Sequence, residues 1–214
     1  MASPYEAQIW GYLMDKIGNA YGVAGLMGNL YAESHLYPNI VQGDVPISNF
    51  SVEYTAKVDN GTISKDEFCN NGPNGGGYGL AQWTYPARKK ALYEMYRQNA
   101  KYNSIGSINL ALDYLMVELE TTYDDILYTL KTASDIRTAS DTVLHDFENP
   151  ADQSTAVEEY RESLGIGYYN TYSGSDPILP APDTPVAPDN PDPEPTKRKN
   201  TLSKLLLFAI ATDY

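Results

Sequence analysis

Glu33 is the residue whose type and position most clearly suggest acid–base chemistry. An apolar stripe at helical spacing precedes it, and continuing the stripe by three residues leads to Glu33. Desolvation and the negative end of the helix dipole both disfavour an ionised carboxylate there. We therefore expect an acid that stays protonated near neutral pH and can protonate the leaving-group oxygen of a glycosidic bond. The competing interpretation is an exposed glutamate at a helix end. The stripe consists of Val23, Leu26, Met27 and Leu30.

A second candidate site is the glycine-rich segment from Gly75 to Trp83, GGGYGLAQW. Its glycines allow positive φ and close backbone approach, while Tyr78, Gln82 and Trp83 supply stacking surfaces and hydrogen-bonding groups. Because Tyr78 and Trp83 follow glycines and precede a helix, we expect both rings to be partly exposed beside Glu33. A structural turn explains the glycines equally well, and phosphate binding is disfavoured because no Gly-Lys-Ser/Thr follows.

The remaining reactive side chains are few. Cys69 is the single cysteine, and His35 and His145 are the two histidines. An internal disulfide is therefore excluded, and little is left for a Cys- or His-based metal centre. A Cys/His peptidase is disfavoured because Cys69 lacks a Gly-x-Cys-Trp-type context. We expect neither a metal nor a cofactor.

The composition of the 214-residue chain narrows the class of protein further. A net charge of −13 disfavours duplex nucleic acid and anionic surfaces as main partners. No apolar run approaches the roughly 18–20 residues of a membrane-spanning helix. We also expect no secretory signal, because Met1-Ala-Ser-Pro4 lacks a basic region. The 19 tyrosines against 4 phenylalanines suit a groove for sugars or peptides, with an ordinary tyrosine-rich surface as the alternative.

Helical patterns dominate the region that must position these groups. Small residues at Ala24, Gly28 and Ala32 recur every four residues, which predicts close approach by another helix. Capping boxes at 3–6 and 155–158 mark the starts of the first and last helices. The predicted helices cover about residues 4–17, 21–34, 86–100, 107–121, 123–132, 134–147 and 155–168.

The exception lies between Asn39 and Gly77, where the pattern predicts a small β-hairpin. Extended segments at 47–50, 54–58 and 62–64 surround Asp59-Asn60-Gly61, a strong type I′ turn signal. Helices that flank one hairpin define an α+β fold that is mostly α-helical.

Composition divides the chain near residue 173. Eight of the fourteen prolines, five acids and no base fall between Ser173 and Pro195, which predicts an extended linker. We therefore expect a folded domain at 1–173, a Pro/Asp-rich linker at 174–195 and a short basic-apolar tail at 196–214. The tail could dock on a partner, lie on a membrane or belong to a longer chain.

Two motifs, at 27–34 (MGNLYAES) and 77–83 (GYGLAQW), together resemble the lysozyme superfamily in its goose-type and lytic-transglycosylase branches. The closer resemblance is to the phage tail lysozyme family, and it covers about residues 5–173. Three further segments resemble that family: 54–61 (YTAKVDNG), 83–88 (WTYPAR) and 147–150 (FENP).

The resemblance implies a lysozyme-like fold with Glu33 as the general acid. Tyr78, Gln82 and Trp83 would line a glycan-binding cleft between the hairpin side and the helical lobe. The implied activity is a phage-encoded glycoside hydrolase, a muramidase that cleaves β-1,4 bonds of peptidoglycan. It would work from the virion tail or be released at the bacterial cell wall, as an endolysin is. The implied partners are peptidoglycan glycan strands and, through residues 196–214, phage tail proteins.

The second carboxylate of such an enzyme stays open. An inverting hydrolase needs one roughly 6.5–9.5 Å from the acid, and a retaining hydrolase needs it closer. The candidates are Asp44, Glu53 and Asp59, although Asp59 is also explained as a turn residue. A lytic transglycosylase needs only the single acid, because the substrate's own 6-hydroxyl attacks the anomeric carbon. The same residues also fit a glucosaminidase with this fold, or a catalytically inactive tail component that is structural or binds glycans.

Overall fold

The computed structural model describes residues 3–46, 48–70 and 76–175, which fall into two compact units. The first unit contains residues 3–37 and 123–175, so the chain leaves it once and returns. The second unit contains the described residues between 38 and 122. Nearly all of the predicted linker and the whole predicted tail lie outside the described residues.

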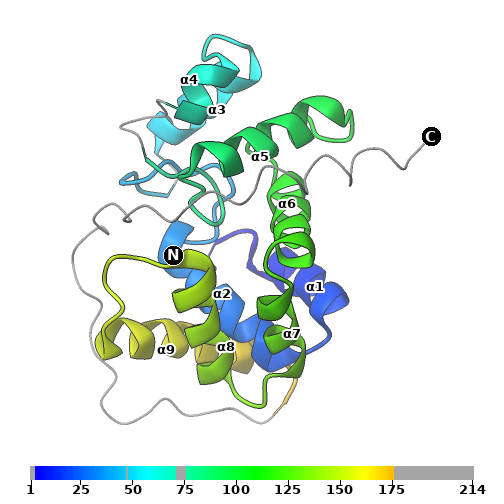
Figure 1. Cartoon of the computed structure of the whole chain (residues 1–214), viewed down its shortest axis with the longest axis vertical. Coiled ribbons are helices and arrows are strands. Elements are labelled where there is room, and N and C mark those ends of the chain that lie inside the picture. The colour runs from blue at the N-terminus through cyan, green and yellow to red at the C-terminus, as the bar shows by residue number, and fades with distance from the viewer. Residues whose placement is uncertain (1–2, 47, 71–75, 176–214) are drawn as a thin grey trace. The chain divides into compact units, whose positions relative to one another are not determined.

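The first unit is built around one buried helix, α2 (Ala20–Ser34), as Figure 1 shows. Its neighbours α1, α7, α8, η2 and α9 all pack against it. The apolar stripe predicted for α2 is fully buried, which confirms the helical periodicity. The bounds of these neighbours are α1 (Glu6–Ile17), α7 (Asp124–Thr132), α8 (Ile136–Thr142), the π-helical segment η2 (Val143–Glu148) and α9 (Thr155–Tyr172).

The row of small residues on α2 lets α9 approach closely, as predicted. A Cβ atom on Gly28 would lie 2.4 Å from the carbonyl oxygen of Arg161, and one on Gly165 would lie 2.9 Å from that of Ala24. Contacts under 3.0 Å are not tolerated by a real Cβ atom, so the two helix backbones meet where both lack side chains.

The two predicted capping boxes have different outcomes. In the first box, the Ser3 N–H donates to Glu6 Oε1 at 3.0 Å as predicted, but α1 begins at Glu6 with Tyr5, not Ser3, as its N-cap. The second box is wrong, because α9 begins at Thr155 with Ser154 as its N-cap. The carboxylate of Glu158 is instead engaged by side chains of α8 and η2.

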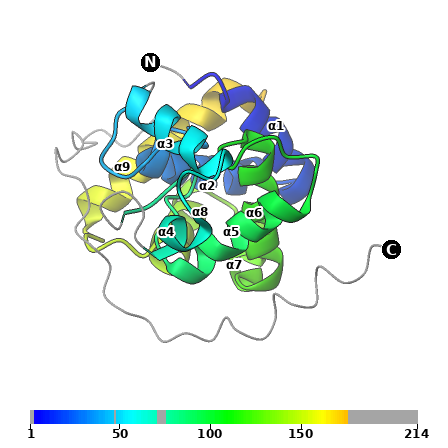
Figure 2. The same cartoon turned by 90° about the horizontal axis from the view of Figure 1, so that it is seen from above.

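The second unit contains four helices within its described residues. Helix α4 packs against α5, and α5 packs against α6, as can be followed in Figure 2. The helices predicted after Pro86 and near residue 107 are confirmed by α5 and α6. The four are α3 (Asn49–Asp59), α4 (Lys65–Asn70), α5 (Pro86–Gln98) and α6 (Ile108–Thr121).

The predicted β-hairpin is wrong, because its central part is α3. Ser48 caps this helix by accepting from the Phe50 N–H, and a buried face at helical spacing follows. The Asn60-Gly61 pair ends the helix instead of turning a hairpin, since Gly61 adopts the left-handed φ of 80° that a helix C-terminus uses. Among the described residues, β-structure is limited to single-residue bridges that join Tyr78 to Val41 and to Trp83.

No helix within the described residues is long and apolar enough to cross a membrane.

Candidate active site

Glu33 lies in the last turn of α2, on the first unit, with 15% of its side chain exposed. The predicted position at the end of a buried helix is therefore confirmed. The helix ends one residue later, where His35 adopts a left-handed φ of 51° and donates its N–H to the Tyr31 carbonyl oxygen. The carboxyl group thus sits at the negative end of the helix dipole.

The side chain of Arg161, from α9, bridges two residues of α2. Its Nη2 donates to Glu33 Oε1 at 2.6 Å and its Nη1 donates to Asn29 Oδ1 at 3.1 Å. Arg161 is almost completely buried, and Asn29 is fully buried. Because Asn29 and Glu33 are four residues apart on one helix, a single guanidinium reaches both.

Asn29 is itself held by a third helix. Its Nδ2 donates to the carbonyl oxygen of Gly25, at 2.9 Å, and to the carbonyl and hydroxyl oxygens of Ser140 in α8, at 3.1 and 3.0 Å. A hydrogen-bonded series therefore runs from Ser140 through Asn29 and Arg161 to Glu33. It fixes the carboxyl group from three helices, which is the kind of support a catalytic side chain needs.

From the sequence we expect an acid that stays protonated near neutral pH at this position, and the ion pair with Arg161 is an interaction that the sequence did not predict. A guanidinium stabilises the carboxylate form of a partner. Within the described residues of the first unit, Oε1 carries the only hydrogen bond of the Glu33 side chain, and Oε2 makes none. No local signal could have revealed Arg161, because it lies 128 residues further along the chain.

The glycine-rich loop, with Tyr78, Gln82 and Trp83, lies in the second unit. The Tyr78 and Trp83 backbones exchange both of their hydrogen bonds, at 3.2 and 3.0 Å. Gly79 and Gln82, at the two ends of the turn between them, have φ values of 81° and 43°. Such a φ is uncommon for a residue with a side chain, and it marks Gln82 as strained.

The expectation that the two rings are partly exposed is wrong. Trp83 is 0% exposed and Tyr78 is 1% exposed. The Trp83 Nε1–H donates to Glu118 Oε2 at 2.7 Å, and Glu118 also accepts two hydrogen bonds from Arg88. A ring enclosed in this way cannot stack on a sugar, so the aromatic residues of the motif stabilise the loop.

Tyr78 is fixed by its hydroxyl group, which lies 2.8 Å from Thr55 Oγ1 of α3. Burial raises the pKa of Tyr78 far above its ordinary value of 10.0. The phenol is therefore a neutral hydrogen-bonding group at any physiological pH. Its contact with Thr55 ties the glycine-rich loop to the segment whose sequence favoured a hairpin.

Gln82 is the one residue of the three that is not fully buried. Its Nε2 donates to the carbonyl oxygens of Ile40 and Gly79, at 3.2 and 3.0 Å. Its Oε1 has no hydrogen-bond partner in the described part of the chain. Gly77 has to be glycine, because a Cβ there would lie 2.7 Å from the backbone carbonyl oxygen of Gln82.

Two of the three candidate second carboxylates have structural partners within the second unit. Asp44 accepts from both the N–H and the hydroxyl group of Ser51, and these bonds lower its pKa against the opposing effect of burial. Asp59 accepts from Ser104 and from the Ile105 N–H, both at 2.7 Å. Glu53 is exposed on α3.

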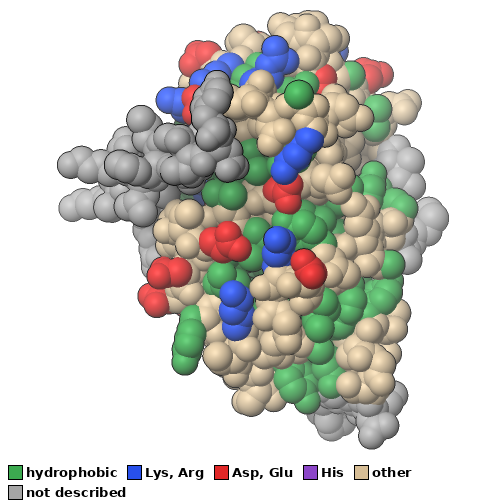
Figure 3. Space-filling view, turned by 90° about the vertical axis from the view of Figure 1, so that its right-hand side faces the viewer, with side chains coloured by type: hydrophobic (Ala, Val, Ile, Leu, Met, Phe, Trp, Pro, Cys, Tyr) green, Lys and Arg blue, Asp and Glu red, His purple; other side chains and the backbone are tan. Residues whose placement is uncertain are grey.

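Charged side chains of both signs are interspersed on the face that Figure 3 draws. The described residues contain no group of three or more His, Cys, Asp or Glu side chains that could hold a metal ion.

The model of the phage tail lysozyme family matches residues 5–172, so the chain belongs to this family. Membership implies a lysozyme-like, peptidoglycan-degrading role and an association with the phage tail. Comparison with curated proteins and with solved structures gave no match.

Proposed function

We propose that this chain cleaves β-1,4 glycosidic bonds of bacterial peptidoglycan, as a muramidase with Glu33 as its general acid. The observation that supports this best is the hydrogen-bonded series that holds the Glu33 carboxyl group at the end of a buried helix. The family supports the class of substrate.

In this mechanism, Glu33 donates a proton from Oε2 to the glycosidic oxygen while the bond from that oxygen to the anomeric carbon breaks. The leaving sugar takes the proton, and the other sugar passes through an oxocarbenium-like state. Arg161, on Oε1, stabilises the carboxylate that Glu33 becomes. Water then attacks the anomeric carbon and releases a proton, which restores the acid.

Gln82 is the residue of the glycine-rich loop that we propose for glycan contact. It is the only one of the three motif residues that is not fully buried, and an amide side chain can hydrogen-bond the hydroxyl and acetamido groups of a sugar. Tyr78 and Trp83 hold the loop in shape and act through Gln82.

A lytic transglycosylase is the second candidate, and one observation favours it. Asp44 and Asp59 are both occupied with backbone N–H groups of the second unit. A mechanism that needs only one acid fits a chain in which two of three further candidates have structural roles. In that case the 6-hydroxyl of the substrate replaces water.

Mass spectrometry of digested cell walls tests both candidates. A muramidase gives muropeptides with reducing muramic ends, a glucosaminidase gives reducing glucosamine ends, and a transglycosylase gives 1,6-anhydro ends. Intact cell walls after incubation with folded protein would support an inactive, glycan-binding role and contradict the proposal.

We place the enzyme on the virion tail, in line with its family, with a released endolysin as the alternative. The proposed attachment to tail proteins uses residues 196–214. Immunoblotting of purified virions distinguishes the two locations, because an endolysin is absent from the particle.

A further inference from the structure

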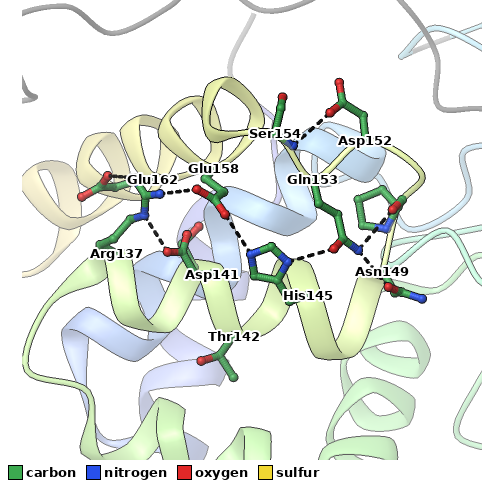
Figure 4. A network of polar contacts seen from close by, with 12 residues as sticks. Arg137, Asp141, Thr142, His145, Asn149, Asp152, Gln153, Ser154, Glu158 and Glu162 are labelled. Carbon is green, nitrogen blue, oxygen red and sulfur yellow. Dashed lines mark hydrogen bonds and ion pairs between the residues drawn. The ribbon is translucent and has the colours of Figure 1, made fainter.

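A polar network joins α8, η2 and α9 in the first unit, and the proposed mechanism does not use it. Figure 4 shows His145 between Glu158 and Gln153, with Arg137 among acidic side chains. Arg137, His145 and Glu158 come from the three consecutive segments α8, η2 and α9, and Gln153 from the loop before α9, so the network holds the segments to one another. The guanidinium of Arg137 donates to Asp141, Glu158 and Glu162.

Both ring nitrogens of His145 face oxygen atoms. Nε2 lies 3.0 Å from Glu158 Oε1, and Nδ1 lies 3.0 Å from Gln153 Oε1. The other end of the Gln153 amide fixes its orientation, because its Nε2 donates to the carbonyl oxygen of Pro150, which can only accept. The oxygen of Gln153 is therefore the atom that faces His145.

One protonation state satisfies this geometry. A neutral imidazole has a single N–H, so one of the two contacts would bring two acceptors together, whereas the imidazolium donates at both nitrogens. A proton on Glu158 is disfavoured, because its other oxygen accepts from the guanidinium of Arg137.

The surrounding charges favour the same state. Three carboxylates face the single guanidinium of Arg137, so a second positive charge is favourable there. Hydrogen bonding to Gln153 and to Glu158 raises the pKa of His145 above 6.5. The charged groups that Figure 4 labels in the network with His145 are Arg137 and Asp141 of α8 and Glu158 and Glu162 of α9, and its own segment η2 also contains Asp146 and Glu148.

We propose that His145 is a proton-controlled positioning residue, which fastens η2 to the first turns of α9 and so keeps Arg161 against Glu33. Helix α9 carries Glu158 and, one turn later, Arg161. The fastened segment is π-helical, an uncommon geometry that is frequent near functional sites. The step from Arg161 to catalysis rests on the proposed function, whereas the protonation state of His145 does not.

Deprotonation should loosen this attachment. Because the folded-state pKa of His145 lies above its unfolded value near 6.5, its stabilising contribution is complete below that pH and is lost as the pH rises through the folded-state value. The bond to the carboxylate is charge-assisted and therefore the stronger of the two. The proton that leaves is then the one on Nδ1, and the neutral ring keeps Nε2–H.

NMR titration of the full chain tests the protonation state directly. The chain has two histidines, and His35→Gln, outside the network, assigns their ring signals. We expect His145 to titrate above pH 6.5 and to become the Nε2–H tautomer. Titration at or below 6.5, or a neutral Nδ1–H ring, would overturn the proposal.

Two variants test the consequence. His145→Gln is neutral at every pH, and His145→Lys keeps a positive donor across the range. The stability lost in His145→Gln, read as a drop in urea midpoint from wild type, should be larger at pH 6 than at pH 9. Burial lowers the pKa of His35, so the effect of His35→Gln should change with pH in the opposite direction. His145→Lys should keep its cell-wall activity at pH 9 relative to pH 6 better than wild type does.

An equal urea difference at both pH values would contradict the fastening role. His145 could titrate as expected, and the urea difference could change with pH, while neither wild type nor any variant digests cell walls. In that case the proposed function fails and the fastening role stands. If wild type digests walls and His145→Gln has the wild-type pH profile, the positioning role fails alone.

Discussion

Arg161 Nη2 lies 2.6 Å from Glu33 Oε1, and the two residues are separated by 128 positions in the sequence. The contact exists because α9 crosses α2 at Gly28, where no side chain keeps the helices apart. A sequence feature that looks purely structural therefore determines the surroundings of the candidate acid.

Removal of the guanidinium should damage both activity and folding. Arg161→Ala leaves Glu33 and Asn29 without their common donor, and loss of one partner of a buried ion pair costs about 3–5 kcal/mol. Arg161→Lys keeps the charge but not the two-pronged geometry, so it should fold better than Arg161→Ala and still lose activity. Urea unfolding and cell-wall clearing, measured on the same preparations, check this. Full activity of Arg161→Lys would show that orientation by the guanidinium is not needed.

Gly28→Ala should destabilise the protein by about 1–3 kcal/mol, because its Cβ would meet the backbone of α9 at 2.4 Å. Gly167→Ala is the matched control, since it lies in α9 with nothing within 4 Å. Alanine is favoured over glycine in a helix by roughly 0.5–1 kcal/mol, so the control should be stabilised. A lower urea midpoint for Gly28→Ala and a higher one for Gly167→Ala, each relative to wild type, would confirm the close approach. A Gly28→Ala variant with the wild-type midpoint would contradict it.

Trp83→Phe should reduce stability with little effect on the activity of the molecules that remain folded. The substitution removes the Nε1–H that Glu118 accepts, but it keeps most of the buried ring. The loss should be about 1–3 kcal/mol. Activity per folded molecule, obtained by correcting the clearing rate with the folded fraction, is the measurement. A large loss of that corrected activity would restore the role of sugar contact that the sequence predicts.

The helices were predictable because their apolar periodicity is local. The segment from Asn49 to Asp59 was not, since its apolar residues also fit an extended pattern and Asn60-Gly61 serves equally in a hairpin turn and at a helix end. The packing of this segment against the rest of the second unit decides between helix and hairpin, and the local sequence pattern does not contain that information.

The candidate site was predictable in the same uneven way. The place of Glu33 follows from one helix and was correct. The surroundings of Trp83 depend on Arg88 of α5 and Glu118 of α6. The contact of Arg161 with Glu33 depends on the return of the chain to the first unit. Residues near a motif in sequence indicate its chemistry, whereas its partners are set by tertiary packing.

The rate of cell-wall clearing by Glu33→Gln, at equal folded concentration, tests the central claim most directly. Glutamine keeps the volume and can accept from Arg161 but cannot deliver a proton. It also leaves the buried guanidinium of Arg161 without a counter-charge, so stability should fall as well, and the comparison therefore has to be made on folded protein. Glu120→Gln, at an exposed position of α6, is the control and should match wild type. General acid catalysis is worth about 10²–10⁴-fold, so we expect a loss of at least that size. A folded Glu33→Gln protein that clears cell walls at the wild-type rate would contradict the account.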